Sequence, residues 1–329
     1  SRSLIDDLAK SPHLPVMDSE RYRSMNHFQQ DFLYLTETVR QSHPEPYAAW
    51  SNDEFDAEQD RMLASLAAET SSVRFEGFVQ SFLSRLKDSH TSAQLPWNAG
   101  QREYPVSFVW IKDTLALASV AQESDTALIG SRVLSFNQHS TEDVLSRFTR
   151  FIAYENLYQA RRILQYYFVF PTLHRDAGIL ASDTLDLRLS TSDHTERTYR
   201  VLPSEKPKRF SHVVPHPVTQ RINRPFRYTI LKEDNACYLQ WNTMMDLRAV
   251  GYVSFPTNLL AYPVFWYMGI GYFENFLDDM FEDMQDDNIR TLIVDLRGNG
   301  GGSSVYGEQL FYHLGVASDI RSYSMAIRF

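Results

Sequence analysis

The sequence predicts an α/β protein of several domains, and three observations lead to that fold class. The chain has 329 residues, more than one hydrophobic core usually organises, so two or three domains of about 100–150 residues are expected. Apolar residues recur at helical spacing in the first part of the chain and in short β-like runs in the middle. The last part alternates strands with amphipathic helices, which is typical of a βα unit with parallel strands.

Residues 1–100 are predicted to form a helical region. Three helices are indicated between residues 26 and 87, and the first ends before Pro44 because a proline disfavours helical torsion angles in the residue before it. Lys87-Asp88-Ser89-His90 follows the third helix, and Thr91–Leu95 favours a strand. The three helices are predicted from apolar positions at three- and four-residue spacing. These positions are Phe28, Phe32, Leu35 and Val39 in the first, Phe55, Met62 and Leu66 in the second, and Phe75, Phe78, Val79, Phe82, Leu83 and Leu86 in the third.

Residues 104–205 are predicted to form a β-rich module of ordinary domain size. Its helices are expected at Thr141–Phe151 and near Glu155–Val169. Its short strands are expected at Val106–Trp110, Leu115–Val120, Arg132–Phe136, Leu185–Leu189 and Thr198–Leu202.

Residues 206–225 are predicted to be a linker, because four prolines fall between residues 204 and 225. Residues 226–329 are predicted to form a further domain that contains a parallel pair of strands. Its elements are a strand at Ala236–Trp241, a long uncharged loop at Ala249–Phe273, a helix at Tyr272–Gln285, a strand at Thr291–Leu296 and a helix at Ser304–Leu314.

The uncharged segment Ala249–Phe273 is the one stretch to consider as a membrane span, since its 25 residues are long enough to cross a bilayer. It contains two prolines, three glycines and several polar residues, and it lies between two strands of one predicted sheet. We therefore predict a loop that packs on the protein and lines or covers a cleft, with a membrane span as the disfavoured alternative.

Composition argues against several classes of partner and site. A net charge of −9 without a Lys/Arg cluster argues against a nucleic-acid partner, and the single cysteine, Cys237, excludes an internal disulfide and a Cys-based zinc site. The predicted helix Tyr272–Gln285 has an acidic face without histidine, which is interpreted as a solvated face. No metal and no cofactor are predicted. The acidic positions of that face are Glu274, Asp278, Asp279, Glu282 and Asp283.

The most informative stretch is Thr291–Ser304, an apolar run that leads into a glycine-rich turn. The run predicts a buried parallel strand, and Gly300, Gly301 and Gly302 allow a sharp turn and a close approach to a ligand. Free N–H groups in such a turn suit an anion or a developing oxyanion, although a purely structural turn is the alternative. Ser303 or Ser304 is predicted to cap the following helix rather than act as a nucleophile.

The spacing of the glycines excludes two phosphate-binding motifs. A P-loop needs a lysine before its final Ser or Thr, and none is present here. The dinucleotide-binding pattern fails as well, because Ser303 and Val305 stand where it requires glycine.

The segment Asp-Leu-Arg-Gly-Asn-Gly-Gly-Gly at 295–302, after an apolar strand, resembles the C-terminal processing (tail-specific) serine peptidase family and its tricorn-type branch. The resemblance extends to residues 43–47, His-Pro-Glu-Pro-Tyr, and to residues 86–91, Leu-Lys-Asp-Ser-His-Thr. It also extends to residues 128–137, which are similar to the PDZ segment of these enzymes. In that segment Ser131 replaces the usual Asp, and Gln138 replaces the Gly that follows.

This resemblance implies a fold and a set of roles. The implied fold is a helical N-terminal region, a PDZ-like module and the first half of a crotonase-like protease core. In the tricorn-type branch, His90 would be the general base beside Ser89, and the Gly300–Gly302 turn would hold the oxyanion. Asp295 and Arg297 would brace the turn. In the tail-specific branch a lysine is the base, and His90 would be structural.

The function implied by the resemblance is hydrolysis of peptide bonds in a peptide or protein substrate by a serine nucleophile. No segment before Phe329 matches the nucleophile segment of the family, so the chain is expected to stop before that serine and to be inactive alone. A non-catalytic peptide- or ligand-binding protein on the same scaffold is the alternative. The family implies a periplasmic or secreted location, and the sequence gives no indication of the oligomeric state.

Overall fold

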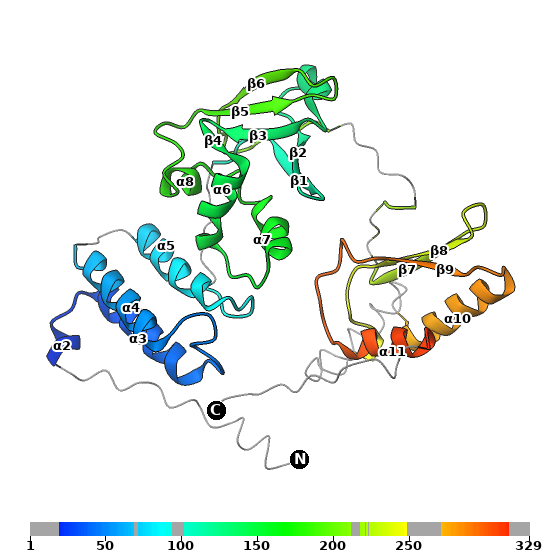
Figure 1. Ribbon diagram of the computed structural model, residues 1–329, viewed down its shortest axis with the longest axis horizontal. Helices are drawn as coiled ribbons and strands as arrows, with labels where there is room; N and C mark the ends of the chain where they lie inside the picture. Colours follow the sequence, from blue (N-terminus) through cyan, green and yellow to red (C-terminus); the bar gives the residue numbers. More distant parts are fainter. Residues whose placement is uncertain are drawn as a thin grey trace, which may run out of the picture. The chain divides into compact units, whose positions relative to one another are not determined.

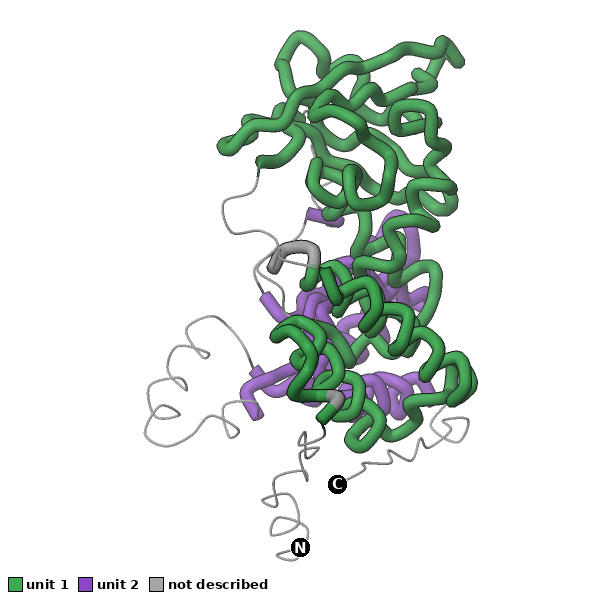
Figure 2. The backbone as a smooth tube through the Cα atoms, turned by 90° about the vertical axis from the view of Figure 1, so that its left-hand side faces the viewer, with its two compact units in different colours: residues 1–213, 326–329 green, residues 214–325 purple. Residues whose placement is uncertain are grey.

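The computed structural model describes residues 20–68, 72–93, 102–211, 218–220, 222, 224–248 and 271–315 (Figure 1). The chain divides into two compact units, one of residues 1–213 with 326–329 and one of residues 214–325 (Figure 2). The predicted helical region and the predicted β-rich module fall in the first unit. The described residues of the predicted last domain, which contains the glycine-rich turn, fall in the second unit, and the predicted linker is divided between the two units.

The helices of the first unit are α2 (Glu20–Arg23), α3 (His27–Ser42), α4 (Asn52–Leu66) and α5 (Ser72–Leu83), and the short 3₁₀ turn η1 (Ser84–Leu86) follows. Capping boxes begin α3 and α4, because the Asn26 and Ser51 side chains each accept a hydrogen bond from the backbone three residues on. The three helices predicted from apolar spacing are therefore confirmed. The described part of the segment predicted as a strand, Thr91–Ala93, is not a strand.

The β-rich part of this unit is an antiparallel sheet in the order β1-β2-β3-β5-β6, with β4 paired to β3. Its strands are β1 (Ser107–Ile111), β2 (Thr114–Ser119), β3 (Arg132–Phe136), β4 (His139–Ser140), β5 (Leu185–Ser190) and β6 (Glu196–Val201). The five predicted strands are all present. Phe210, inside the predicted linker, forms an antiparallel bridge with Val120, so that part of the segment is bound to the sheet.

The helical elements of the β-rich part are η2 (Glu123–Leu128), α6 (Thr141–Phe148), η3 (Thr149–Phe151), α7 (Leu157–Leu164) and α8 (Pro171–Asp176). The predicted helix over Glu155–Val169 is shorter than expected. It begins after Asn156, whose side chain caps it, and ends at Leu164. Helix α8 was not predicted, although Pro171 at its first position is a typical start signal.

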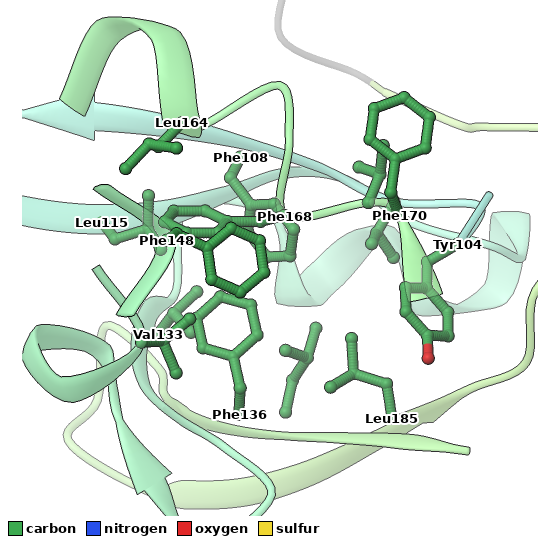
Figure 3. Packing of buried hydrophobic residues seen from close by; sticks show 14 of the residues in the cluster. Tyr104, Phe108, Leu115, Val133, Phe136, Phe148, Leu164, Phe168, Phe170 and Leu185 are labelled. Carbon is green, nitrogen blue, oxygen red and sulfur yellow. The ribbon is translucent and has the colours of Figure 1, made fainter. Parts of the chain in front are cut away.

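Aromatic side chains fill the core of this part. Phe136, Phe148 and Phe168 meet at its centre, with ring centroids 5.3 Å apart for Phe136–Phe168 and 5.2 Å apart for Phe148–Phe168 (Figure 3). His174 of α8 is fully buried among them, 4.8 Å from the Phe148 ring, and its Nε2 lies 2.8 Å from the Phe168 carbonyl oxygen. The other ring nitrogen, Nδ1, has no hydrogen-bond partner among the described residues. Burial lowers the pKa of His174 to about 4.

The second unit has a three-stranded sheet in the order β7-β8-β9, formed by β7 (Phe226–Leu231), β8 (Ala236–Trp241) and β9 (Thr291–Asp295). Strands β7 and β8 form an antiparallel hairpin that the sequence analysis missed. Strands β8 and β9 are parallel, with Ala236 opposite Thr291 and Gln240 opposite Asp295, which confirms the predicted parallel pair.

Helices α10 (Phe273–Asp286) and α11 (Val305–His313) pack on this sheet through Leu239, Phe273 and Tyr306, with the Trp241 and Phe273 rings stacked at 4.8 Å. Among the described strands, β9 lies at one end of this sheet, and its Ile293 and Val294 are 43% and 37% exposed. The expectation that this apolar run is a buried strand is therefore wrong.

The segment Ala249–Phe273 falls outside the described residues except for its last three. Of these, Phe273 is fully buried and begins α10. Within the described ranges, no helix combines the length and apolar character needed to cross a membrane.

The burial of His174 predicts that acid destabilises the first unit. The unfolded chain binds a proton near the ordinary histidine pKa of about 6.5, whereas the folded chain does so only near 4. The contribution of the neutral His174 ring to the free energy of unfolding is therefore fully present above about pH 6.5 and is lost as the pH falls from about 6.5 towards 4. We expect a loss of about 2 kcal/mol between pH 7.5 and 5 from this group.

This loss is measured by urea unfolding of the whole chain at the two pH values, with far-ultraviolet circular dichroism as the signal. His174→Gln removes the titration and should flatten the pH dependence by about the same amount. His194→Asn is the matched control, because His194 is exposed in the β5–β6 turn. An unchanged pH dependence in His174→Gln would contradict the prediction.

Candidate functional site

The Ser89-His90 pair lies in a turn directly after η1, in the first unit. Lys87 ends η1 in the left-handed conformation, with φ of 56°, and so redirects the chain out of the helical region. The turn is held to the neighbouring loop by Lys87, whose ammonium group lies 3.9 Å from the centre of the Tyr154 ring and bonds its hydroxyl. Ser89 and His90 are therefore presented by an anchored turn.

Asp88 organises this turn by accepting hydrogen bonds on both carboxylate oxygens. Its Oδ1 accepts from the His90 N–H at 2.9 Å, and its Oδ2 accepts from Thr91 Oγ1 at 2.5 Å. His43 Nε2 lies 3.2 Å from the same Oδ2. Burial opposes ionisation of Asp88, but these hydrogen bonds from Thr91, His90 and His43 outweigh it and lower its pKa.

The contact between His43 and Asp88 brings two of the motif segments together. The Glu45 N–H donates to His43 Nδ1 at 3.1 Å, so His43 Nε2 carries the proton and donates to Asp88. Residues 43–47 and 86–91 were noted separately in the sequence, and their contact is a result of the folded structure.

Glu155 is a member of this cluster that the sequence analysis missed. Ser89 Oγ donates to Glu155 Oε1 at 2.6 Å and lies 3.3 Å from His90 Nδ1. The Glu155 carboxylate is 3.9 Å from His90 Nδ1, and the His90 side chain is 91% exposed. Glu155 stands 66 residues after Ser89. No local signal links them, so only the fold could reveal the contact.

The glycine-rich turn lies in the second unit, at the carboxyl end of β9. Asp295 Oδ1 accepts from the Arg297 N–H at 3.0 Å and from Arg297 Nε at 2.8 Å. Tyr238 of β8 donates its hydroxyl proton to Asp295 Oδ2. The hydrogen bond from Arg297 is the largest cause that holds the pKa of Asp295 far below its ordinary value. These contacts join Asp295, Arg297 and Tyr238 to one another, and a bracing role of Asp295 and Arg297 for the turn stays a prediction.

Most N–H groups of the turn already have acceptors. The Gly300 N–H donates to the Asn242 carbonyl oxygen at 3.1 Å, and the Gly301 N–H donates to Asn299 Oδ1 at 2.7 Å. Within the described part of the chain, the Gly302 N–H donates to no acceptor. Of the three candidate donors, Gly302 is therefore the one whose N–H has no acceptor among the described residues, and Gly302 is an exposed residue.

Gly302 must be a glycine for steric reasons. Its φ is 137°, and it forms a parallel bridge with Met244, whose N–H bonds the Gly301 carbonyl at 2.8 Å. A Cβ atom at Gly302 would lie 2.1 Å from the Met244 carbonyl oxygen. At Gly300, by contrast, no atom lies within 4 Å of the position of a Cβ.

A buried carboxylate, Asp246, holds the surroundings of the turn, and the sequence analysis also missed it. Asp246 is fully buried and accepts from the Phe273 N–H at 3.0 Å and from the Tyr306 hydroxyl at 2.8 Å. It also accepts from the Arg248 N–H at 2.8 Å and from the Arg248 guanidinium at 2.9 Å. Burial, followed by the bond to Asp246, raises the pKa of Tyr306 to about 12.

The sequence analysis assigned Ser303 or Ser304 to capping of the helix that follows the turn. Ser304 is the residue before α11, but its side chain makes no capping hydrogen bond, so the prediction of a side-chain cap is wrong for Ser304. Backbone carbonyls close the first turn instead, since Gly307 N–H bonds the Ser304 carbonyl at 2.8 Å.

On the acidic face of α10, Asp278 bonds His313 at 3.0 Å, and Asp283 bonds Tyr228 at 2.6 Å.

The described residues thus contain two clusters with possible chemistry, in different units. The first is the Asp88-Ser89-His90 turn with Glu155, and the second is the Gly300–Gly302 turn, which follows the hydrogen-bonded pair Asp295 and Arg297. The general-base role of His90 and the oxyanion role of the glycine turn stay predictions.

Comparison with known proteins gives a likeness of fold. No protein-family model and no curated protein matches the chain. The chain is similar to the crystal structure of mature CPAF, a serine protease of Chlamydia, with a TM-score of 0.54 and 14% identity over 86% of this chain. It is also similar to mature CPAF complexed with lactacystin, with a TM-score of 0.54 and 15% identity over 86% of this chain.

A serine-to-alanine mutant of CPAF matches with a TM-score of 0.54 and 16% identity over 85% of this chain. At these identities the likeness shows a shared mixed α/β, protease-like fold and does not show a shared activity. The chain spans 57% of the mature CPAF chain and 58% of the chain in the lactacystin complex.

Gly302→Ala tests the steric constraint at the glycine turn. The added Cβ would lie 2.1 Å from the Met244 carbonyl oxygen, so the Met244–Gly302 bridge must open. We expect a loss of about 1–3 kcal/mol in the free energy of unfolding, the usual cost of a strained backbone site. Gly300→Ala is the matched control and should cost about 1 kcal/mol or less, because its Cβ meets nothing. Equal urea midpoints for the two variants would contradict the steric argument.

Asp246→Ala tests the buried carboxylate. The change removes the shared acceptor of Phe273 and Tyr306 and leaves Arg248 without this partner, so we expect a loss of about 3–5 kcal/mol in the free energy of unfolding. Asp278→Ala is the control in the same unit and should cost about 0–1 kcal/mol, since the Asp278 side chain is 65% exposed. A loss for Asp246→Ala no larger than that for Asp278→Ala would show that the buried network contributes little.

Proposed function

We propose that the protein is a serine peptidase that hydrolyses peptide bonds on the scaffold it shares with CPAF. The observation that carries the proposal is the fold likeness over 86% of this chain to a serine protease. The motif segments 86–91 and 295–302 support it, because each contributes groups of the kind that peptide hydrolysis needs. The lactacystin complex of CPAF supports a peptide-like substrate.

The proposal gives His90 the role of general base. If His90 Nδ1 carries its proton, it donates to Ser89 Oγ at 3.3 Å, and Ser89 donates in turn to Glu155 at 2.6 Å. These two hydrogen bonds orient the ring and leave Nε2 with a lone pair, which takes the proton of a nucleophilic hydroxyl and returns it to the leaving amine. Ser89 and Glu155 are then positioning residues.

The proposal gives the glycine turn the role of oxyanion donor, through the Gly302 N–H in particular. This donor is open, whereas the N–H groups of Gly300 and Gly301 already bond Asn242 and Asn299. A backbone donor that is fixed before the reaction stabilises the developing charge without a reorganisation cost. The brace of Asp295 and Arg297 keeps the turn in place.

Finer assignments belong to the same proposal and rest on the sequence resemblance. They are the tricorn-type branch, a PDZ-like identity for the β-rich module, and the first half of a crotonase-like core for the second unit. They also include a periplasmic or secreted location. We assign no described serine as the nucleophile, since Ser89 bonds Glu155 and Ser304 begins a helix.

One observation favours the alternative of a non-catalytic binding protein on the same scaffold. Two of the three N–H groups of the turn are engaged within the chain, as they would be in a purely structural turn. Labelling with a serine-reactive fluorophosphonate probe separates the two. The 329-residue chain is expected to stay unlabelled and inactive, and a longer form that carries the nucleophile is expected to be labelled.

The role of His90 is tested by His90→Ala in a labelled, active form of the protein. We expect kcat to fall about 10⁴-fold or more, since a base that acts in the transition state is lost, with folding unchanged at this exposed position. His139→Ala is the matched control, because His139 is another histidine beside a carboxylate in the same unit and should leave kcat near its original value. Near-normal turnover of His90→Ala would assign the chemistry to a Ser–Lys arrangement.

A further inference from the structure

Three side chains of the first unit place metal-binding atoms around one point. They are Asp88, His90 and Glu155, whose ligand atoms all lie within 4.8 Å of one another. His90 Nδ1 is 3.8 Å from Asp88 Oδ1 and 3.9 Å from Glu155 Oε1. The three come from two segments, so the group exists only in the folded chain.

We propose that this group, the Asp88–His90–Glu155 site, binds a divalent transition-metal ion such as Zn²⁺. Imidazole nitrogen and carboxylate oxygen are both ligand types of Zn²⁺, and zinc sites with three protein ligands keep a fourth position open. Zinc–ligand bonds of about 2.1 Å place two ligands of one ion about 3.4 Å apart in tetrahedral geometry. The distances from His90 Nδ1 to Asp88 Oδ1 and Glu155 Oε1 exceed this by a few tenths of an ångström, which exposed side chains can close.

The group combines one rigid ligand with two adjustable ones. Asp88 is fixed because its Oδ2 accepts from Thr91 and His43, and among the described residues its Oδ1 accepts only from the His90 N–H. A hydrogen bond from outside the ligand set to a ligating carboxylate is the usual support of a metal site. His90 and Glu155 are 91% and 51% exposed, so they can adjust to the ion.

Occupancy of the site has a direct consequence for the chemistry of His90, and this part rests on the proposed function. A metal ion at Nδ1 requires the lone pair of that nitrogen, so the neutral ring carries its proton on Nε2. Nε2 is then a donor and cannot take a proton from a hydroxyl. Metal binding at Nδ1 therefore prevents His90 from acting as the general base.

Two other histidines of the described chain serve as comparisons. His139 Nδ1 lies 2.7 Å from Asp143, and His313 Nε2 lies 3.0 Å from Asp278. Neither pair has a third ligand-type side chain grouped with it among the described residues. They are expected to bind Zn²⁺ more weakly than the Asp88–His90–Glu155 site.

The test is titration of the 329-residue chain with ZnCl₂ alone in isothermal titration calorimetry. We expect one principal site, which His90→Ala and Glu155→Gln each weaken about tenfold or more. His139→Ala is the matched control and should leave that site unchanged. Far-ultraviolet circular dichroism confirms that each variant is folded, and Glu155→Gln changes the charge with little change in shape.

Three outcomes would overturn the proposal. They are no Zn²⁺ binding to the original chain, the same affinity in both site variants as in the original chain, or loss of the site in His139→Ala. Because the readout is binding, it is independent of peptidase activity. Zn²⁺ binding that depends on His90 and Glu155 supports the site even where no form of the protein shows turnover, and that result counts against the proposed function alone. Inhibition by Zn²⁺ of an active form then tests the switch of the general base.

Discussion

The second unit depends on the buried carboxylate of Asp246. It accepts from the first N–H of α10, from the hydroxyl of Tyr306 on α11, and from the backbone and side chain of Arg248. Its burial excludes water, so these donors are its only described source of solvation. Asp246 thereby fixes the start of α10 through Phe273 and the packing of α11 through Tyr306.

The glycine turn lies within reach of this network. Met244 stands two residues before Asp246 and pairs with Gly302, and α11 starts three residues after Gly302. The network therefore fixes the chain on both sides of the turn. The left-handed, crowded conformation at Gly302 persists because its surroundings are held in this way.

Asp88 has a comparable role in the first unit under different physical conditions. It too accepts several hydrogen bonds and joins segments distant in sequence, since His43 and His90 both contact it. Asp88 and the neighbouring Glu155 are partly exposed, however, so their charge acts on an accessible histidine. The two roles that we propose for His90 both use this exposed group, one as a proton acceptor through Nε2 and the other as a metal ligand through Nδ1. The ring cannot perform both at once, because each requires a different tautomer.

Local patterns in the sequence determined the helices of residues 26–87, the five strands of the β-rich module, the parallel pair β8–β9 and the positions of Ser89-His90 and Gly300–Gly302. Apolar periodicity, capping residues and glycine act over a few residues and leave a readable pattern. Only the tertiary structure decided that β9 lies exposed at one end of the described sheet and that the Gly302 N–H has no acceptor among the described residues. It also decided that Asp246 and Glu155 belong to the two clusters. Each of these depends on contacts between residues far apart in the chain, and such contacts leave no periodic trace in one sequence.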